Sequence, residues 1–147
     1  MSKKKAHFLV VDDNRMDIEL TLNAFREFRL HNTVHVATSG MMALDYVFGR
    51  GAYADRQKYL MPDLILLDLK MPGMDGHEVL RQLKSTPVIR RLPVVVLTSS
   101  QEDGDRALSY DYGANSYLVK PVSFDGFMEV IQTLDSYWRG LNVGPPM

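Results

Sequence analysis

Four short apolar segments of this chain each end in a polar side chain that can take part in chemistry. The four junctions are Val11-Asp12-Asp13, Leu67-Asp68, Leu97-Thr98 and Val119-Lys120. Short continuous apolar runs rich in Val, Ile and Leu are typical of parallel strands that are buried on both faces. Ligands of open parallel sheets bind just beyond the carboxyl ends of the strands. We therefore expect three carboxylates, a hydroxyl and an ammonium to meet at one edge of a sheet.

The segments between these strands have the periodicity of amphipathic helices. We expect strands over 7–11, 33–37, 64–67, from 94 onward and 116–119, and helices over 15–29, from Ser39-Gly40 onward, 77–84, 103–112 and 124–139. Asn14 is expected to cap the first helix, whose apolar side includes Phe25 and Phe28. This alternation predicts one α/β domain with a parallel sheet.

Composition excludes several classes of function. The chain has 147 residues, of which 46% are hydrophobic, and a net charge of −1, so neither nucleic acid nor an anionic membrane is an expected partner. It has no cysteine, which excludes disulfides and thiol catalysis. No apolar run approaches the roughly 20 residues that span a bilayer, and none resembles a signal peptide. We therefore expect a cytoplasmic protein.

The predicted cluster of acidic side chains needs a positive charge. Asp12, Asp13 and Asp68 would repel one another unless a cation lay among them. Oxygen ligands of this kind suit Mg²⁺, which binds one or two carboxylates and keeps several waters. With Thr98 and Lys120 added, the group forms a cage for a phosphoryl group. An aspartate that attacks phosphorus becomes an aspartyl phosphate, a form of covalent catalysis.

From about Phe8 to Tyr137 the chain resembles the receiver domains of two-component response regulators. The motifs are Val11-Asp12-Asp13, Leu66-Leu67-Asp68-Leu69-Lys70-Met71-Pro72-Gly73-Met74-Asp75-Gly76, Leu97-Thr98-Ser99 and Lys120-Pro121. The resemblance implies a flavodoxin-like, doubly wound α/β fold, with five parallel strands in the order 2-1-3-4-5 and helices on both faces. It implies a single receiver domain over 1–147, with a core of about 6–139 and a flexible tail over 140–147.

The resemblance also implies a role for each motif residue. Asp68 would be the phosphoacceptor, and Mg²⁺ would be bound by Asp13, Asp68 and the backbone carbonyl of Lys70, with Asp12 acting through water. Thr98 and Lys120 would contact the phosphoryl oxygens. Tyr117, three positions before the lysine, would act with Thr98 as a rotameric switch. The bond between Lys120 and Pro121 would be cis, an isomer that proline makes accessible.

In this family, two variable positions tune the rate at which the phosphoryl group is lost. In this chain they are Lys70 and Ser100. Lys70 either lies over the phosphoryl group and impedes water, or is a solvated lysine. The implied function is a phosphorylation-dependent signalling module, not an enzyme, that takes its phosphoryl group from a histidine kinase and hydrolyses it slowly. We expect output by binding an unidentified target or by onward phosphotransfer to another protein, because fewer than ten residues follow the last helix.

Other functions remain as alternatives. A phosphatase with an aspartyl-phosphate intermediate carries an aspartate two positions after the nucleophile, where this chain has Lys70. A flavin or nucleotide binder would have a phosphate-binding loop after the first strand, where Asp12-Asp13-Asn14 is acidic. A receiver-like interaction module that takes no phosphate is the third alternative.

Two features depart from the plain family pattern. The fourteen-residue segment 49–62 exceeds the usual αβ loop and resembles the insertion in single-domain regulators paired with cyanobacterial phytochrome-type histidine kinases. The last helix has a wider apolar side than one sheet needs, which predicts a second buried contact. We expect a homodimer through the fourth helix, fifth strand and fifth helix, using Tyr110, Val130, Leu134 and Tyr137.

Overall fold

Five parallel strands form one sheet in the order β2-β1-β3-β4-β5. The computed structural model describes residues 6–27 and 33–147. The strands are β1 (His7–Val11), β2 (Thr33–Ala37), β3 (Leu64–Leu67), β4 (Val94–Thr98) and β5 (Ser116–Val119). The predicted strands and the predicted order are therefore confirmed.

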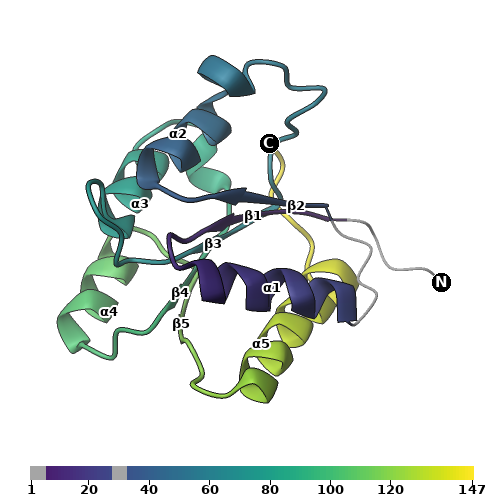
Figure 1. The fold of residues 1–147 in the computed structure, drawn as a ribbon. Coiled ribbons are helices and arrows are strands. Elements are labelled where there is room, and N and C mark those ends of the chain that lie inside the picture. Colours follow the sequence, from purple (N-terminus) through teal and green to yellow (C-terminus); the bar gives the residue numbers. More distant parts are fainter. Residues whose placement is uncertain (1–5, 28–32) are drawn as a thin grey trace.

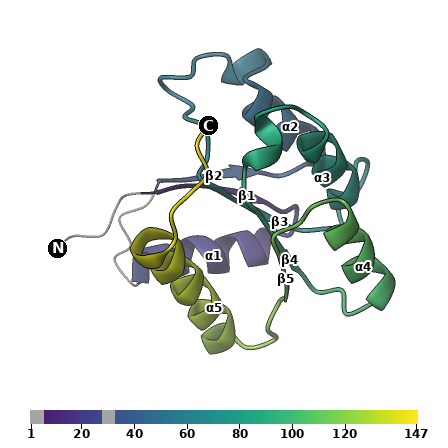
Figure 2. The same ribbon diagram turned by 180° about the vertical axis from the view of Figure 1, so that it is seen from behind.

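Five α-helices cover the two faces of this sheet. They are α1 (Arg15–Glu27), α2 (Gly40–Phe48), α3 (Gly76–Lys84), α4 (Asp103–Asp111) and α5 (Phe124–Ser136). Helices α1 and α5 lie together on one face, while α2, α3 and α4 lie on the other (Figures 1 and 2). The first helix was expected to reach residue 29, but Phe28 and residue 29 lie outside the described residues. No helix in the described ranges is long and apolar enough to cross a bilayer.

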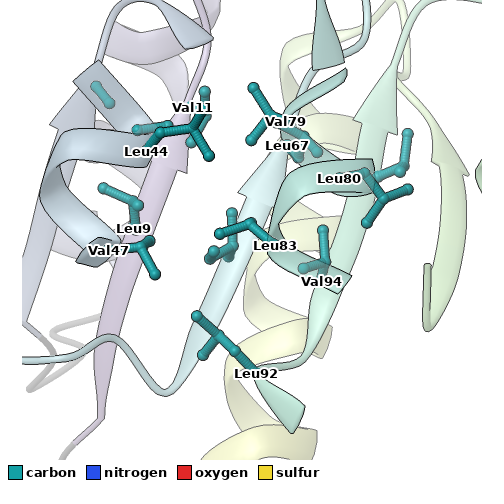
Figure 3. Close-up of a cluster of buried hydrophobic side chains, with 14 of the residues drawn as sticks. Leu9, Val11, Leu44, Val47, Leu67, Val79, Leu80, Leu83, Leu92 and Val94 are labelled. Atoms are coloured by element: carbon teal, nitrogen blue, oxygen red, sulfur yellow. The ribbon is translucent and has the colours of Figure 1, made fainter. Parts of the chain in front are cut away.

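Alternate residues of each central strand supply two separate cores. Leu9 and Val11 of β1 pack with α2 and α3 (Figure 3), whereas Phe8 and Val10 pack with α1 and α5. All four residues of β3 are buried, as are all five of β4. Burial on both faces explains why these strands appear in the sequence as continuous apolar runs.

Short polar side chains begin four of the helices, the last of them Ser123 at α5. Asn14 Oδ1 accepts a hydrogen bond from the N–H of Asp17, as the sequence predicts. Ser39 caps α2 and Asp75 caps α3 in the same way. These caps satisfy N–H groups that have no partner within the helix. Helices α1 and α3 therefore begin directly at the edge of the sheet where the polar strand ends meet.

The long segment between α2 and β3 folds back on the edge of the sheet. It contains a short 3₁₀ turn, Gly51–Tyr53, and its Arg56 donates hydrogen bonds to the carbonyls of Tyr46, Val47 and Tyr53. The bonds to Tyr46 and Val47 reach carbonyls at the carboxyl end of α2, which lack partners within the helix.

Four rings pack around this segment, at centroid distances of 4.7 to 6.1 Å; they are His35, Tyr46, Tyr53 and Tyr59. Since His35 belongs to the edge strand β2, the rings attach the segment to the sheet. The Tyr46 hydroxyl also donates a hydrogen bond to the carbonyl of Leu60, so the segment is held at two points.

Helix α5 ends at Ser136 and continues as a π-helical turn, Tyr137–Leu141. The predicted helix, 124–139, is therefore three residues too long at its α-helical end. Its wide apolar side has a second contact within the same chain, because α5 packs against both the sheet and α1. Beyond it, the Arg91 guanidinium donates a hydrogen bond to the carbonyl of Pro146. The flexibility of the tail stays a prediction.

Candidate functional site

The register of the sheet brings the polar strand ends together. Val11 of β1 lies opposite Leu67 of β3, so Asp12 and Asp68 follow paired residues. The N–H of Asp68 donates to the carbonyl of Val11, which extends this pairing by one residue. On the other side of β3, Thr98 ends β4, and the N–H of Lys120 donates to its carbonyl. All these polar residues therefore lie at the carboxyl edge, where parallel sheets bind ligands.

Three of the carboxylates form one compact group. An oxygen of each of Asp12, Asp13 and Asp68 lies within 4.8 Å of the others. Asp12 and Asp68 are buried, whereas Asp13 is exposed. Oxygen donors at these separations fit a hard divalent cation such as Mg²⁺, and the exposed side leaves room for its waters. The acidic metal group predicted from the sequence is therefore present among the described residues.

The ammonium of Lys120 lies among three carboxylates. Its Nζ is 2.8 Å from Asp12 Oδ2, 2.7 Å from Asp17 Oδ2 and 3.2 Å from Asp68 Oδ2. The lysine side chain is only 8% exposed, so water screens these charges weakly. Asp12 and Asp68 were expected near this lysine, whereas Asp17 was not.

Burial and charge act against each other on these groups. Burial raises the pKa of Asp12 to about 6, although hydrogen bonds from Lys120 Nζ and from the N–H of Asn14 oppose the change. Burial of Lys120 disfavours its charged form, but its hydrogen bonds to Asp12 and Asp17 and the charges of Asp12 and Asp68 outweigh this and raise its pKa. The lysine therefore stays charged, while Asp12 holds its proton to a higher pH than an exposed aspartate does.

Thr98 and Tyr117 lie on the neighbouring strands β4 and β5. Thr98 is fully buried, and its Oγ1 accepts a weak hydrogen bond from the N–H of Ser100 at 3.4 Å. Tyr117 is partly buried against the core, and its hydroxyl donates to the carbonyl of Ser100. Both side chains therefore contact the loop that connects β4 to α4.

Lys70 and Ser100, the two expected rate-tuning positions, contact the same carboxylate. Lys70 Nζ lies 3.1 Å from Asp105 Oδ2, and the Ser100 hydroxyl donates to that oxygen at 2.6 Å. The N–H of Lys70 also points to Asp68 Oδ1, at 3.4 Å. Asp105 in the first turn of α4 therefore connects the loops that follow β3 and β4.

Gly76 allows α3 to begin directly against the Asp68 backbone. A Cβ at this position would lie 2.3 Å from the carbonyl oxygen of Asp68. This separation is far shorter than van der Waals contact, and the atom in the way belongs to the backbone. The last glycine of the turn that follows Asp68 is therefore required for close packing, not for a special backbone angle.

One prediction about this site is wrong. The bond between Lys120 and Pro121 is trans, and the described residues contain no cis peptide. Trans is the intrinsically favoured isomer even before proline, by about 0.5–1 kcal/mol. With this trans bond, Lys120 reaches all three of its carboxylates.

The four residues expected at a dimer surface differ in exposure. Tyr110 and Tyr137 are each 50% exposed. Val130 and Leu134 are partly buried against the core between α1, α5 and the sheet. The apolar excess of α5 is therefore largely used inside the chain, and the two tyrosines are the accessible part of the predicted surface.

Asp17 and Asp105 are the two site residues that sequence reasoning missed. Both lie in the first turn of a helix, where acidic side chains commonly complement the helix dipole. That local explanation is sufficient from the sequence, because nothing in it indicates a distant lysine partner.

Comparisons with known proteins agree with the geometry of this site. The family model described as the response regulator receiver domain matches residues 8–132. The probable methanogenesis regulatory protein FilR2 of Methanothrix harundinacea is 36% identical over 93% of this chain and 86% of its own length. Response regulator Rcp1 of Synechocystis is 32% identical over 88% of this chain and 86% of its own length.

Solved structures show the same relationship. The phosphorylated cyanobacterial phytochrome response regulator RcpA has a TM-score of 0.90 and 34% identity, and the match covers 97% of this chain and all of RcpA. The Mn²⁺-bound form of Rcp1 has a TM-score of 0.86 and 30% identity over 96% of this chain and 99% of that one. The chain belongs to the response regulator receiver domain family, and the phytochrome response regulators Rcp1 and RcpA are its homologues.

Proposed function

We propose that Asp68 accepts a phosphoryl group from the phosphohistidine of a sensor histidine kinase. The observation that supports this most is the position of the Lys120 ammonium, 3.2 Å from Asp68 Oδ2 and beside the group of three carboxylates. A buried cation at this distance can bind the oxygens of an incoming phosphoryl group. Family membership supports the same role, as does the likeness to a phosphorylated regulator.

The reaction exchanges one bond to phosphorus for another. An Asp68 carboxylate oxygen forms a P–O bond while the P–N bond of the phosphohistidine breaks, and the released imidazole takes up a proton. Hydrolysis ends the signal: water attacks phosphorus, the bond between phosphorus and the Asp68 oxygen breaks, and inorganic phosphate forms. Lys120 and Thr98 would stabilise the charge on the transferring oxygens in both reactions.

Asp13, Asp68 and the Lys70 carbonyl would hold Mg²⁺, with Asp12 acting through water. A bound Mg²⁺ would neutralise part of the phosphoryl charge and orient its oxygens for displacement. The compact group formed by Asp12, Asp13 and Asp68 fits this ion. The Mn²⁺-bound form of Rcp1, to which the chain is similar, supports a divalent metal here.

Phosphorylation would change a surface through Thr98 and Tyr117. The Thr98 hydroxyl would move toward the new oxyanion, and the Tyr117 ring would turn into the space left behind it. The hydrogen bond from Tyr117 to the Ser100 carbonyl ties this ring to the loop before α4, so its movement would reach α4.

The module would act by binding partners and not by turning over a substrate. A phytochrome-type kinase is the proposed donor, because Rcp1 and RcpA are homologues. A homodimer through α4, β5 and α5 is the proposed output, and the exposed Tyr110 and Tyr137 support it. The downstream target and the cytoplasmic location stay predictions from the sequence. Sedimentation that shows only monomer at tens of micromolar, with and without phosphorylation, would contradict the dimer.

Incubation with Mg²⁺ and a small phosphodonor, followed by intact-mass analysis, tests the phosphoacceptor. The wild type should gain the mass of one phosphoryl group, and Asp68→Ala should gain nothing. Asp103→Ala is the matched control, because this aspartate of α4 is 90% exposed, lies outside the carboxylate group and should leave the gain unchanged. No gain in the wild type would favour the phosphate-independent interaction module.

A further inference from the structure

Lys120 has its shortest ion pair with an aspartate outside the proposed metal group. Asp17 Oδ2 lies 2.7 Å from Lys120 Nζ, against 2.8 Å for Asp12 and 3.2 Å for Asp68. An ammonium has three N–H donors, so three carboxylates use its whole capacity. Asp12 and Asp68 belong to the three clustered carboxylates, and Asp17 does not. The contact with Asp17 therefore has no explanation in metal binding.

The backbone holds Asp17 firmly in place. Its N–H donates to the Asn14 side chain, and its carbonyl accepts a hydrogen bond from Thr21 Oγ1. It lies in the first turn of α1, which packs against α5. The carboxylate therefore starts from a fixed point, and its side chain is 23% exposed, less than an ordinary surface aspartate.

We propose that Asp17 is a positioning residue for Lys120, an inference that rests on the proposed phosphoacceptor function. Asp17 and Asp12 fix two of the three N–H groups of the ammonium. The third N–H then points to Asp68, and passes from Asp68 Oδ2 to a phosphoryl oxygen when that group arrives. A lysine side chain has many rotamers, so an anchor at its tip preserves the geometry that stabilises transfer.

If Asp17 acted only through its charge, its removal would speed phosphorylation, whereas positioning predicts that its removal slows phosphorylation. The direction of the change in rate therefore tests the inference. Asp17 adds a negative charge beside a site that binds an anion, so its removal should favour phosphoryl binding if repulsion were its main effect. If positioning dominates, Asp17→Asn should lower the maximal rate of phosphorylation by about tenfold. The half-saturating concentration of the phosphodonor should change little, and Asp17→Glu should recover part of the rate.

The experiment measures phosphorylation of the full chain by a small phosphodonor with Mg²⁺, using intact mass over time. Glu19→Gln is the matched control, since it removes one exposed charge from the same helix and should leave the rate unchanged. A double-mutant cycle with Lys120→Ala gives the decisive comparison, because Asp17→Asn should have no further effect once the lysine is absent. Thermal unfolding of every variant identifies any loss that comes from the fold.

Each result has one meaning. An Asp17→Asn rate equal to or above that of the wild type overturns the inference and leaves the phosphoacceptor function standing. A further tenfold loss in the Lys120→Ala background also overturns it, because the effect would not pass through the lysine. A wild type that gains no phosphoryl group overturns the proposed function, and this inference with it.

Discussion

The ammonium of Lys70 and the carboxylate of Asp105 form an ion pair of 3.1 Å that joins the loop after β3 to α4. The Lys70 side chain is 60% exposed, so the pair is weak enough to exchange with another anion. Lys70 therefore has two possible partners, Asp105 and a phosphoryl group on the nearby Asp68.

This relationship predicts opposite effects of two substitutions on the lifetime of the aspartyl phosphate. Lys70→Ala should shorten it, because the side chain no longer shields phosphorus from water. Asp105→Asn should lengthen it, because Lys70 is released toward the phosphoryl group. Each change should be about three- to fivefold, as expected from an exposed ion pair of up to about 1 kcal/mol.

The lifetime is measured by intact mass after removal of the phosphodonor. Asp103→Asn is the control, since this aspartate is on the same helix, its side chain is 90% exposed, and it pairs with Arg106 one helical turn away. An unchanged lifetime in Lys70→Ala, or a change in the same direction in both variants, would contradict the explanation.

Asp12 predicts a pH dependence of the effect of Mg²⁺ on stability. Burial raises its pKa from 3.8 to about 6, so the metal-free folded state holds this proton more tightly than the unfolded chain. That contribution to stability is complete below about pH 4 and is lost as the pH rises through 6. Mg²⁺ binds the ionised carboxylate and should therefore raise the melting temperature more at about pH 7.5 than at about pH 5.5.

Thermal melts with and without millimolar MgCl₂ at the two pH values measure this difference. Asp12→Asn has no proton to lose at this position, so its response to Mg²⁺ should be small and nearly independent of pH. An equal shift at both pH values in the wild type would show that Asp12 does not control metal binding.

The hydrogen bonds of Arg56 should stabilise the segment between α2 and β3. Its guanidinium donates to carbonyls at the end of α2, and Arg56→Ala would leave these groups without this donor. The free energy of unfolding should fall by about 1–2 kcal/mol. Urea denaturation measures it, and Arg50→Ala is the control, because Arg50 is 52% exposed in its ion pair with Asp45 and should cost less than about 0.5 kcal/mol.

The strained backbone at Val88 makes this position a candidate for a stabilising substitution. Its φ of 68° and ψ of −54° place it at the centre of a classic γ-turn, in which the N–H of Ile89 donates to the carbonyl of Pro87. A β-branched residue is strained there, and Val88 is 48% exposed, so little packing is lost on its removal. Val88→Gly should raise the free energy of unfolding by about 1 kcal/mol.

Val122→Gly serves as the comparison for this prediction. Val122 is fully exposed and has no positive φ, so glycine there should lower stability slightly through the entropy of the unfolded chain. Urea denaturation in which both variants lose stability alike would contradict the strain at Val88.

Much of the fold was predictable because its signals are local. Strands buried on both faces appear as continuous apolar runs, and the bounds of 7–11, 33–37, 64–67 and 116–119 agree with the structure. The convergence of Asp12, Asp68 and Lys120 was predictable too, since parallel strands place their carboxyl ends along one edge. Local apolar runs and a general rule about parallel sheets were sufficient to predict these features.

Other features depend on contacts that no local pattern contains. Lys120 and Asp17 are 103 positions apart, and the sequence offered a sufficient local reason for an aspartate in a helix's first turn. Val130 and Leu134 of α5 are partly buried against the core beside α1, a contact within the chain that helical periodicity cannot distinguish from a contact with a second copy, so the dimer stays a prediction. The cis bond before Pro121 was inferred from resemblance, and the bond is trans.

The sequence by itself determined the parallel α/β fold and the chemistry of the strand ends, because apolar periodicity and residue type are properties of short segments. Only the tertiary structure decided which charged side chains pair with one another. It brought Asp17 to Lys120 and Asp105 to Lys70, and it folded residues 49–62 onto the edge strand. The physical reason is that ion pairs and ring packing depend on distances between helices and loops, which are set only when the whole sheet is assembled.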